Sequence, residues 1–148
     1  MKKQIATVFL TIVICVSSTG VSGAADLQKG LEAHAKGDYE TALREWKPLA
    51  EQGNAGAQYS LGMMHFGYGL TQNYREAGKW FRLAAEQGQT GAQGMLGMIY
   101  EFGHGVVEDH EEAVKWYRLA ADKGVARAQE RLGVMYEFGK GVTPDYTE

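Results

Sequence analysis

Residues 73–88 of the chain read NYREAGKWFRLAAEQG, and residues 109–124 read DHEEAVKWYRLAADKG. The second stretch repeats the first 36 positions later. In the first copy, the apolar residues that follow Tyr74 lie at offsets of 3, 6, 7, 10 and 11, which is the spacing of one face of an α-helix. Asn73 is placed to cap the start of this helix, with Glu76 in the position of a capping box, and Gly88 is placed to end it. Each stretch therefore predicts an amphipathic helix that buries one face against a neighbour.

The repeat extends well beyond these two stretches. Gly53, Gly88 and Gly124 are separated by 35 and 36 residues. Two further signatures keep the same period, an Ala-Gln pair at residues 57–58, 92–93 and 128–129 and a Leu-Gly pair at residues 61–62, 96–97 and 132–133. A period of this length is typical of a solenoid, in which each unit is one supersecondary element that is stable only when stacked on others.

Each unit is predicted to hold two helices. The other helix type runs from about Ala92 to Phe102, with Leu96 and Ile99 at helical offsets. The period of two residues that strands would show is absent from the sequence. We therefore expect an all-α fold of antiparallel helix pairs in residues 25–148, with about three and a half units at residues 27–53, 54–88, 89–124 and an incomplete 125–148.

Small and aromatic residues at fixed positions indicate how the helices pack. Glycines such as Gly62 and Gly97 allow two helices to approach closely, while aromatic side chains fill the space beside them. Trp80 and Trp116 are therefore predicted to lie in the core and not in a cofactor site.

The terminal units depart from this pattern. The first lacks the Leu-Gly pair and has Glu45 where later units have tryptophan, and Pro48 is expected to interrupt its second helix. An atypical terminal unit is a feature of solenoid caps. In the last unit, the helix at residues 128–138 is expected to leave a flank with Leu132 and Met135 uncovered. Either the chain is a fragment or another surface covers this flank, for example a second copy in a self-associated form.

The N-terminus has the layout of a secretory signal peptide. Lys2 and Lys3 precede an apolar run from Ile5 to Val16, which is shorter than the roughly 20 residues that span a bilayer. Small residues predict cleavage after Ala24, so we expect residues 1–24 to be removed and the protein to be periplasmic or secreted. An uncleaved membrane anchor is the alternative interpretation.

Composition argues against several classes of protein. The 148 residues include 15 Lys or Arg and 18 Asp or Glu, which gives a formal charge of −3, and loss of Lys2 and Lys3 would change it to −5. An acidic chain without a basic stripe argues against nucleic acid binding. The single cysteine, Cys15, lies in the signal segment, which argues against a disulfide framework, a cysteine-ligated zinc site and thiol catalysis.

The repeating pattern resembles that of the Sel1-like repeat (SLR) family. The resemblance rests on Ala-Gln ahead of Leu-Gly, on Tyr-x-Phe-Gly-x-Gly-Val, and on Asp-His/Tyr-x2-Ala-x2-Trp-Tyr/Phe-Arg-x-Ala-Ala-x-x-Gly, over residues 27–146. It implies a right-handed α-solenoid related to tetratricopeptide repeats, with a role as an adaptor or scaffold in protein complexes. It also implies that bacterial members are often exported and act in envelope assembly, signalling or host interaction.

Two loop features that could hold a ligand are interpreted as structural. The Phe-Gly-x-Gly loops at residues 66–69, 102–105 and 138–141 follow a helix, whereas a nucleotide-binding loop follows a strand, so their glycines are expected to connect helices at positive φ. In segment 104–112, His110 occupies the repeat position of Tyr39, Tyr74 and Tyr146, and the acidic residues fit the first turn of a helix, which argues against a metal site. We therefore predict neither a metal nor a cofactor.

The sequence offers few residues that could catalyse hydrolysis. Ser60, the only serine left after signal cleavage, lies inside a predicted helix and not on a nucleophile elbow. Relatives with paired cysteines sometimes carry a β-lactamase label, and this chain lacks those cysteines. We therefore expect a non-enzymatic adaptor that binds a protein or peptide, with a cell-wall-associated hydrolase or β-lactamase-like protein as the competing class.

The resemblance also implies that the first helix of each unit lines the concave side of the solenoid, so partner-binding residues are predicted there. The candidates form an apolar and aromatic centre with an acidic rim, which favours a basic or extended partner. They are Tyr59, Met63, Met98, Glu101, Glu130, Val134 and Glu137.

Overall fold

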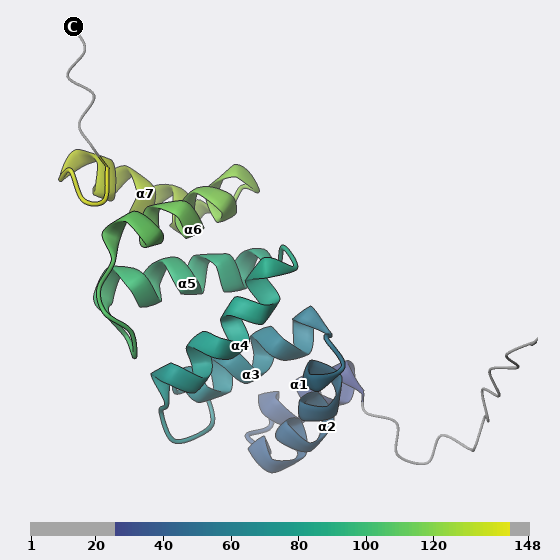
Figure 1. Ribbon diagram of the computed structural model, residues 1–148. Helices are drawn as coiled ribbons and strands as arrows, with labels where there is room; N and C mark the ends of the chain where they lie inside the picture. The colour runs from purple at the N-terminus through teal and green to yellow at the C-terminus, as the bar shows by residue number, and fades with distance from the viewer. Residues whose placement is uncertain (1–25, 143–148) are drawn as a thin grey trace, which may run out of the picture.

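The computed structural model describes residues 26–142, which form seven α-helices and contain no β-strand. The helices are α1 Leu27–Ala35, α2 Tyr39–Glu51, α3 Ala55–Phe66, α4 Tyr74–Glu86, α5 Thr90–Phe102, α6 His110–Asp122 and α7 Ala126–Glu137. Figure 1 shows them stacked in chain order, from α1 and α2 at one end to α7 at the other, and each helix packs mainly on its neighbours in the chain. The prediction of an all-α solenoid is confirmed. The predicted signal peptide, residues 1–24, lies outside the described residues.

The predicted helix starts are confirmed by side-chain caps. The Asn73 Oδ1 atom accepts a hydrogen bond from the backbone N–H of Glu76 at 3.1 Å, and Asp109 Oδ1 accepts one from Glu112 N at 2.9 Å. Each cap satisfies one of the backbone N–H groups that a helix leaves without a partner. The second half of the expected capping box is wrong, because the Glu76 carboxylate instead pairs with Lys79 Nζ at 3.0 Å.

The Ala-Gln signature has a structural role that the sequence did not reveal. In each pair the glutamine Nε2 atom donates to a backbone carbonyl in the last turn of the preceding helix, where carbonyls lack intrahelical partners. The three bonds join Gln58 to Ala50 O at 3.0 Å, Gln93 to Ala85 O at 3.1 Å and Gln129 to Ala121 O at 3.0 Å. The repeated glutamine therefore fixes each unit to the next.

The glycine of the Leu-Gly signature packs against an aromatic ring of the second helix. A Cβ atom at Gly62 would lie 2.5 Å from the nearest ring carbon of Phe81, and one at Gly97 would lie 2.5 Å from Tyr117. Only glycine therefore allows the two helices of a unit to approach this closely. Trp116 is buried, as predicted, whereas Trp80 is only partly buried against the core formed by α1, α2 and α3.

The first unit achieves the same packing with different residues. Trp46 is buried at the position of Phe81 and Tyr117, and it packs against Gly30, where a Cβ atom would clash with the indole. The expected interruption at Pro48 is wrong, because α2 continues through it to Glu51. Pro48 lies in the last turn of α2, so the helix loses a single hydrogen bond there and ends shortly afterwards.

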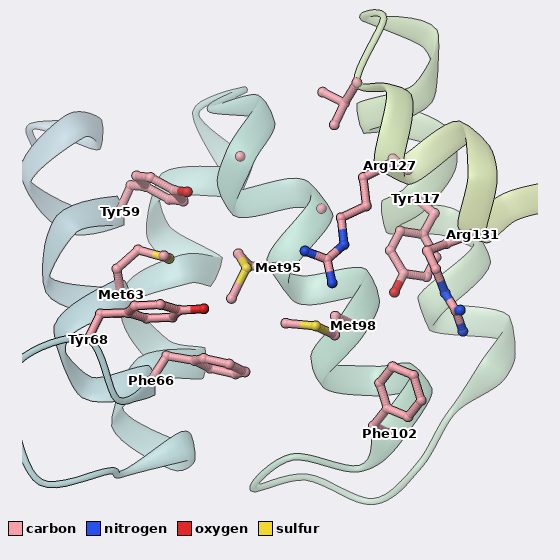
Figure 2. A pocket seen from close by; sticks show the side chains of 14 residues that line it. Tyr59, Met63, Phe66, Tyr68, Met95, Met98, Phe102, Tyr117, Arg127 and Arg131 are labelled. Carbon is pink, nitrogen blue, oxygen red and sulfur yellow. The ribbon is translucent and has the colours of Figure 1, made fainter.

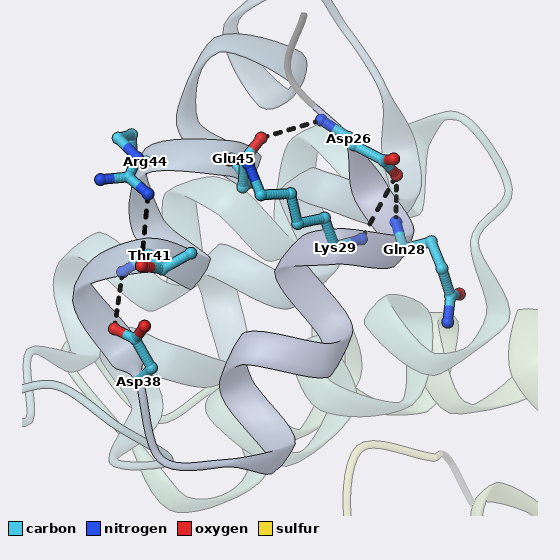
Figure 3. A network of polar contacts seen from close by, with 7 residues as sticks. All are labelled: Asp26, Gln28, Lys29, Asp38, Thr41, Arg44 and Glu45. Atoms are coloured by element: carbon cyan, nitrogen blue, oxygen red, sulfur yellow. Dashed lines mark hydrogen bonds and ion pairs between the residues drawn. The ribbon is translucent and has the colours of Figure 1, made fainter. Parts of the chain in front are cut away.

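Glu45, which replaces the tryptophan of later units, links α1 to α2 (Figure 3). Its carboxylate is buried, pairs with Lys29 Nζ at 2.6 Å and accepts a hydrogen bond from Asp26 N at 3.2 Å. The hydrogen bond to Lys29 lowers the pKa of Glu45 below its ordinary value. Asp26 also caps α1 by accepting from Gln28 N at 2.8 Å. Glu45 therefore joins the two helices of the first unit through polar contacts, where later units have a tryptophan.

The last described helix is better covered than expected. Met135 is fully buried and Leu132 partly buried, because α6 covers the flank of α7 that carries them. The expectation that this flank lacks cover is therefore wrong for Met135, but Leu132 is less covered than its repeat counterparts Leu61 and Leu96, which are each 1% exposed. The open position on α7 is Gly133, where a Cβ atom would meet no atom of residues 26–142 within 4 Å.

The loop glycines adopt positive φ as predicted, in all six positions of the Phe-Gly-x-Gly loops. Gly105 shows why, since it has φ of 74° and a Cβ atom there would lie 2.8 Å from the backbone N of Arg75. These loops therefore connect helices and pack on the preceding unit. Within residues 26–142, no helix is both long enough and apolar enough to cross a membrane.

Candidate functional site

A pocket of about 410 Å³ lies among the first helices of three successive units, α3, α5 and α7 (Figure 2). A volume of this size falls in the range of ordinary ligand pockets. From α3 and its following loop it is lined by Tyr59, Met63, Phe66 and Tyr68, and from α5 by Gly91, Gly94, Met95, Met98 and Phe102. The other wall consists of Tyr117 from α6 together with Val125, Arg127, Ala128 and Arg131.

The centre of the pocket is formed by methionines. Met63, Met95 and Met98 come from facing helices, and Figure 2 shows their thioethers directed into the space between α3 and α5. Methionine side chains are flexible and polarisable, and they adapt to apolar groups of different shape. At the rim, Tyr68 is 55% exposed and Phe102 is 52% exposed. The site thus has an adaptable apolar centre and accessible aromatic edges.

The aromatic wall on the α3 side is held by ring packing. The Phe66 ring lies 4.9 Å from the Tyr74 ring centroid and 5.8 Å from that of His104. His104 in turn stacks on Tyr74 at 4.5 Å. Contacts at these distances stabilise one arrangement of the rings. His104 therefore acts as a packing residue that supports the wall of the pocket.

Three polar side chains form a buried link across α5, α6 and α7 at the other wall. Glu101 of α5 is only 4% exposed, and it accepts hydrogen bonds from Tyr117 Oη at 2.8 Å and from Arg131 Nε at 3.1 Å. A second guanidinium nitrogen of Arg131 pairs with the other carboxylate oxygen. The prediction of Glu101 as an outward-facing binding residue is therefore wrong, because a cation 30 residues later in the chain covers its carboxylate.

This link makes stability at high pH depend on Tyr117. Burial, and then the hydrogen bond to Glu101, raise the pKa of Tyr117 above its ordinary value. In the unfolded chain the phenol ionises near pH 10, so above about pH 10 the folded chain holds a proton that the unfolded chain releases. The contribution of Tyr117 to the free energy of unfolding is complete below this pH and decreases as the pH rises beyond it.

We therefore expect the free energy of unfolding to fall more steeply between pH 10 and 11 in the native protein than in Tyr117→Phe. Urea titrations at a series of pH values measure this, with tyrosinate absorbance recorded on the folded protein. Equal slopes in the two proteins would show that Tyr117 ionises freely in the folded state.

The pocket brings together three of the predicted binding residues, Tyr59, Met63 and Met98. Glu130 and Glu137 are exposed on α7 and Val134 is partly buried there, and none of the three lines the pocket. The expected acidic rim is also wrong, because the charged side chains that line this part of the described structure are Arg127 and Arg131.

Sequence reasoning missed the residues at which the units differ. Gly94 occupies the repeat position of Tyr59 and Glu130, and Arg127 occupies that of Gly56 and Gly91. These differences were visible in the repeat alignment, but a search for shared residues does not select them. Shared residues maintain the stack, so a binding site specific to this protein is expected at positions that are not shared.

The side chains lining the described pocket include no aspartate, glutamate, histidine, serine or cysteine. The arrangement therefore offers apolar contact, aromatic edges and cations, which suit the binding of a ligand.

Comparison with known proteins identifies the repeat. The family described as Sel1 repeat matches residues 55–89, 90–125 and 126–148. One similar solved structure is a protective antigen of uropathogenic Escherichia coli with an SLR fold, which is 37% identical to this chain and matches it with a TM-score of 0.74. Another is a Sel1 repeat protein from Oxalobacter formigenes, which is 35% identical and matches with a TM-score of 0.76. Comparison with curated proteins gives no match.

Both structural matches cover 82% of this chain. They cover 28% of the Escherichia coli protein and 50% of the Oxalobacter formigenes protein, so this chain spans only part of each. The repeat matches together include more than half of the chain; the first two coincide with the helix pairs α3–α4 and α5–α6, and the third begins with α7. The chain belongs to the Sel1 repeat family.

Proposed function

We propose that this protein is an exported, non-enzymatic adaptor that binds a peptide segment of a partner protein in the pocket between α3, α5 and α7. Sel1 repeats generally form non-catalytic scaffolds that mediate protein–protein interaction. The observation that carries the proposal is the methionine-centred pocket itself, because its lining side chains suit adaptable apolar binding. Export is supported by the basic and apolar N-terminal sequence and the small residues before Ala25.

The pocket has the size of a site for a few side chains of an extended chain. It is open at the rim, where Tyr68 and Phe102 are about half exposed, so a peptide can enter and leave along the groove without a lid. Tyr59 at the opposite end packs on Phe81, with 5.8 Å between ring centroids, and lies over Gly91. The wall is therefore preorganised before a ligand arrives, which reduces the entropic cost of binding.

Site-specific photocrosslinking in the native host tests this function. Benzoylphenylalanine at Met98 is expected to crosslink to one defined partner segment, since Met98 lies in the pocket. The same probe at Leu119 of α6, which is exposed and does not line the pocket, is the matched control. Mass spectrometry of the product identifies the partner peptide and shows whether this chain begins at Ala25, as cleavage after Ala24 predicts.

Two results would contradict the proposal. Crosslinks to the same segments from both positions would show that the pocket does not select a partner. A chain that retains residues 1–24 in the cytoplasmic fraction would show that the protein is not exported.

A further inference from the structure

Gly94 has no structural reason to be glycine. It lies in the middle of α5, its φ is not positive, and a Cβ atom there would meet nothing within 4 Å. Glycine in a helix interior costs about 1 kcal/mol relative to alanine. At Gly62 and Gly97, close packing against an aromatic ring offsets this cost, but Gly94 makes no such contact. The feature that Gly94 does provide is open space in the lining of the pocket.

Arg127 provides a cation on the opposite wall. It is exposed at the start of α7, and Figure 2 shows its side chain extending toward the space beside Met95 and Met98. No carboxylate within residues 26–142 pairs with it. The neighbouring Arg131 is already engaged by Glu101, so Arg127 carries the uncompensated charge of the described pocket.

The cation does not result from a generally basic surface, because the chain has a formal charge of −3. A guanidinium binds a carboxylate through two parallel hydrogen bonds, and such charge-assisted bonds are stronger than neutral ones. An arginine beside an apolar cavity therefore complements a ligand that carries an apolar group next to a carboxylate.

We propose that the pocket selects a peptide segment in which a large apolar side chain lies next to a carboxylate. Gly94 provides the room for the apolar side chain, and Arg127 pairs with the carboxylate. The inference rests on the proposed peptide-binding function and defines its ligand chemistry. The carboxylate belongs either to an Asp or Glu side chain or to the C-terminus of the partner, since both present the same two oxygens.

Selection from a displayed library of random heptapeptides tests this inference. The bait is the purified protein, and the Gly94→Leu variant, whose added side chain fills the space, is the counter-bait. Leucine is a good helix former and its Cβ atom meets no neighbour at this position, so the variant is expected to melt no lower than the native protein. We expect enriched peptides to contain a large apolar residue beside an acidic one, and not to be enriched by Gly94→Leu.

Arginine variants then test the role of the charge. The enriched peptide is synthesised with Glu or Asp, with the matching amide, and with a free or amidated C-terminus, and fluorescence anisotropy measures its affinity. Arg127→Gln is expected to weaken binding of the acidic peptide about tenfold and to leave the amide peptide unchanged. Arg75→Gln removes an exposed arginine of α4 that does not line this pocket, and it is expected to have no effect.

The outcomes separate this inference from the proposed function. Enriched peptides that are basic, or that bind Arg127→Gln as well as the native protein, would overturn the inference and leave peptide binding intact. Enrichment by Gly94→Leu equal to that by the native protein would show that the pocket is not the site. If the native protein enriches no peptide and is retained on isolated peptidoglycan, both this inference and the proposed peptide-binding function would be overturned in favour of glycan binding.

Discussion

Replacing Arg131 with methionine is expected to lower the free energy of unfolding by about 3 kcal/mol at pH 7. The substitution keeps the apolar stem of the side chain but leaves the Glu101 carboxylate, which is 4% exposed, with the hydroxyl of Tyr117 as its one remaining side-chain partner in the described structure. A buried charge without its counter-charge is among the costliest defects of a core. Urea unfolding followed by circular dichroism measures the change.

The same helix supplies a control for this prediction. Arg127 lies one turn before Arg131 and pairs with no carboxylate of residues 26–142, so Arg127→Met is expected to change stability by less than about 0.5 kcal/mol. The double variant Glu101→Gln/Arg131→Met is expected to recover much of the loss, since a neutral amide can still accept from Tyr117. Equal losses in Arg131→Met and Arg127→Met would show that the pair contributes little, and no recovery in the double variant would show that the unpaired charge of Glu101 is not the cause of the loss.

The architecture was predictable because the repeat reports directly on packing. An amphipathic helix has to bury its apolar face, and a unit with two such faces is stable only next to similar units. The residues shared at a period of 35 and 36 include the ring partners Gly62 and Gly97 and the carbonyl-binding Gln58 and Gln93. Their recurrence revealed the stack even though the role of the glutamines was not recognised.

The lining of the pocket was predictable only in part. Helical spacing shows which side of its own helix a residue occupies, so Tyr59, Met63 and Met98 were expected on one side of the stack, and all three line the pocket. It does not show which side chain of another unit covers that residue, and for this reason the burial of Glu101 by Arg131 was missed. Three-dimensional packing between units, and not the repeat itself, decides whether the charge in the pocket is negative or positive.

Replacing Gly97 with alanine is expected to lower the free energy of unfolding by about 2 kcal/mol. The added methyl group would lie 2.5 Å from the nearest ring carbon of Tyr117. The ring has little freedom to move away, because it is buried and its hydroxyl is bound to Glu101 at 2.8 Å. The clash therefore has to separate α5 from α6, at a cost that exceeds the roughly 1 kcal/mol gained from the higher helix propensity of alanine.

Gly133 of α7 holds the corresponding repeat position, yet a Cβ atom there would meet no atom of residues 26–142 within 4 Å. Gly133→Ala is therefore expected to raise the free energy of unfolding, by up to about 1 kcal/mol. Both substitutions add the same methyl group to a helix, so the difference of roughly 3 kcal/mol between them isolates the contact with the aromatic ring. Urea unfolding of the two variants measures it, and effects of the same sign and size would mean that ring packing is not the reason for glycine at this position.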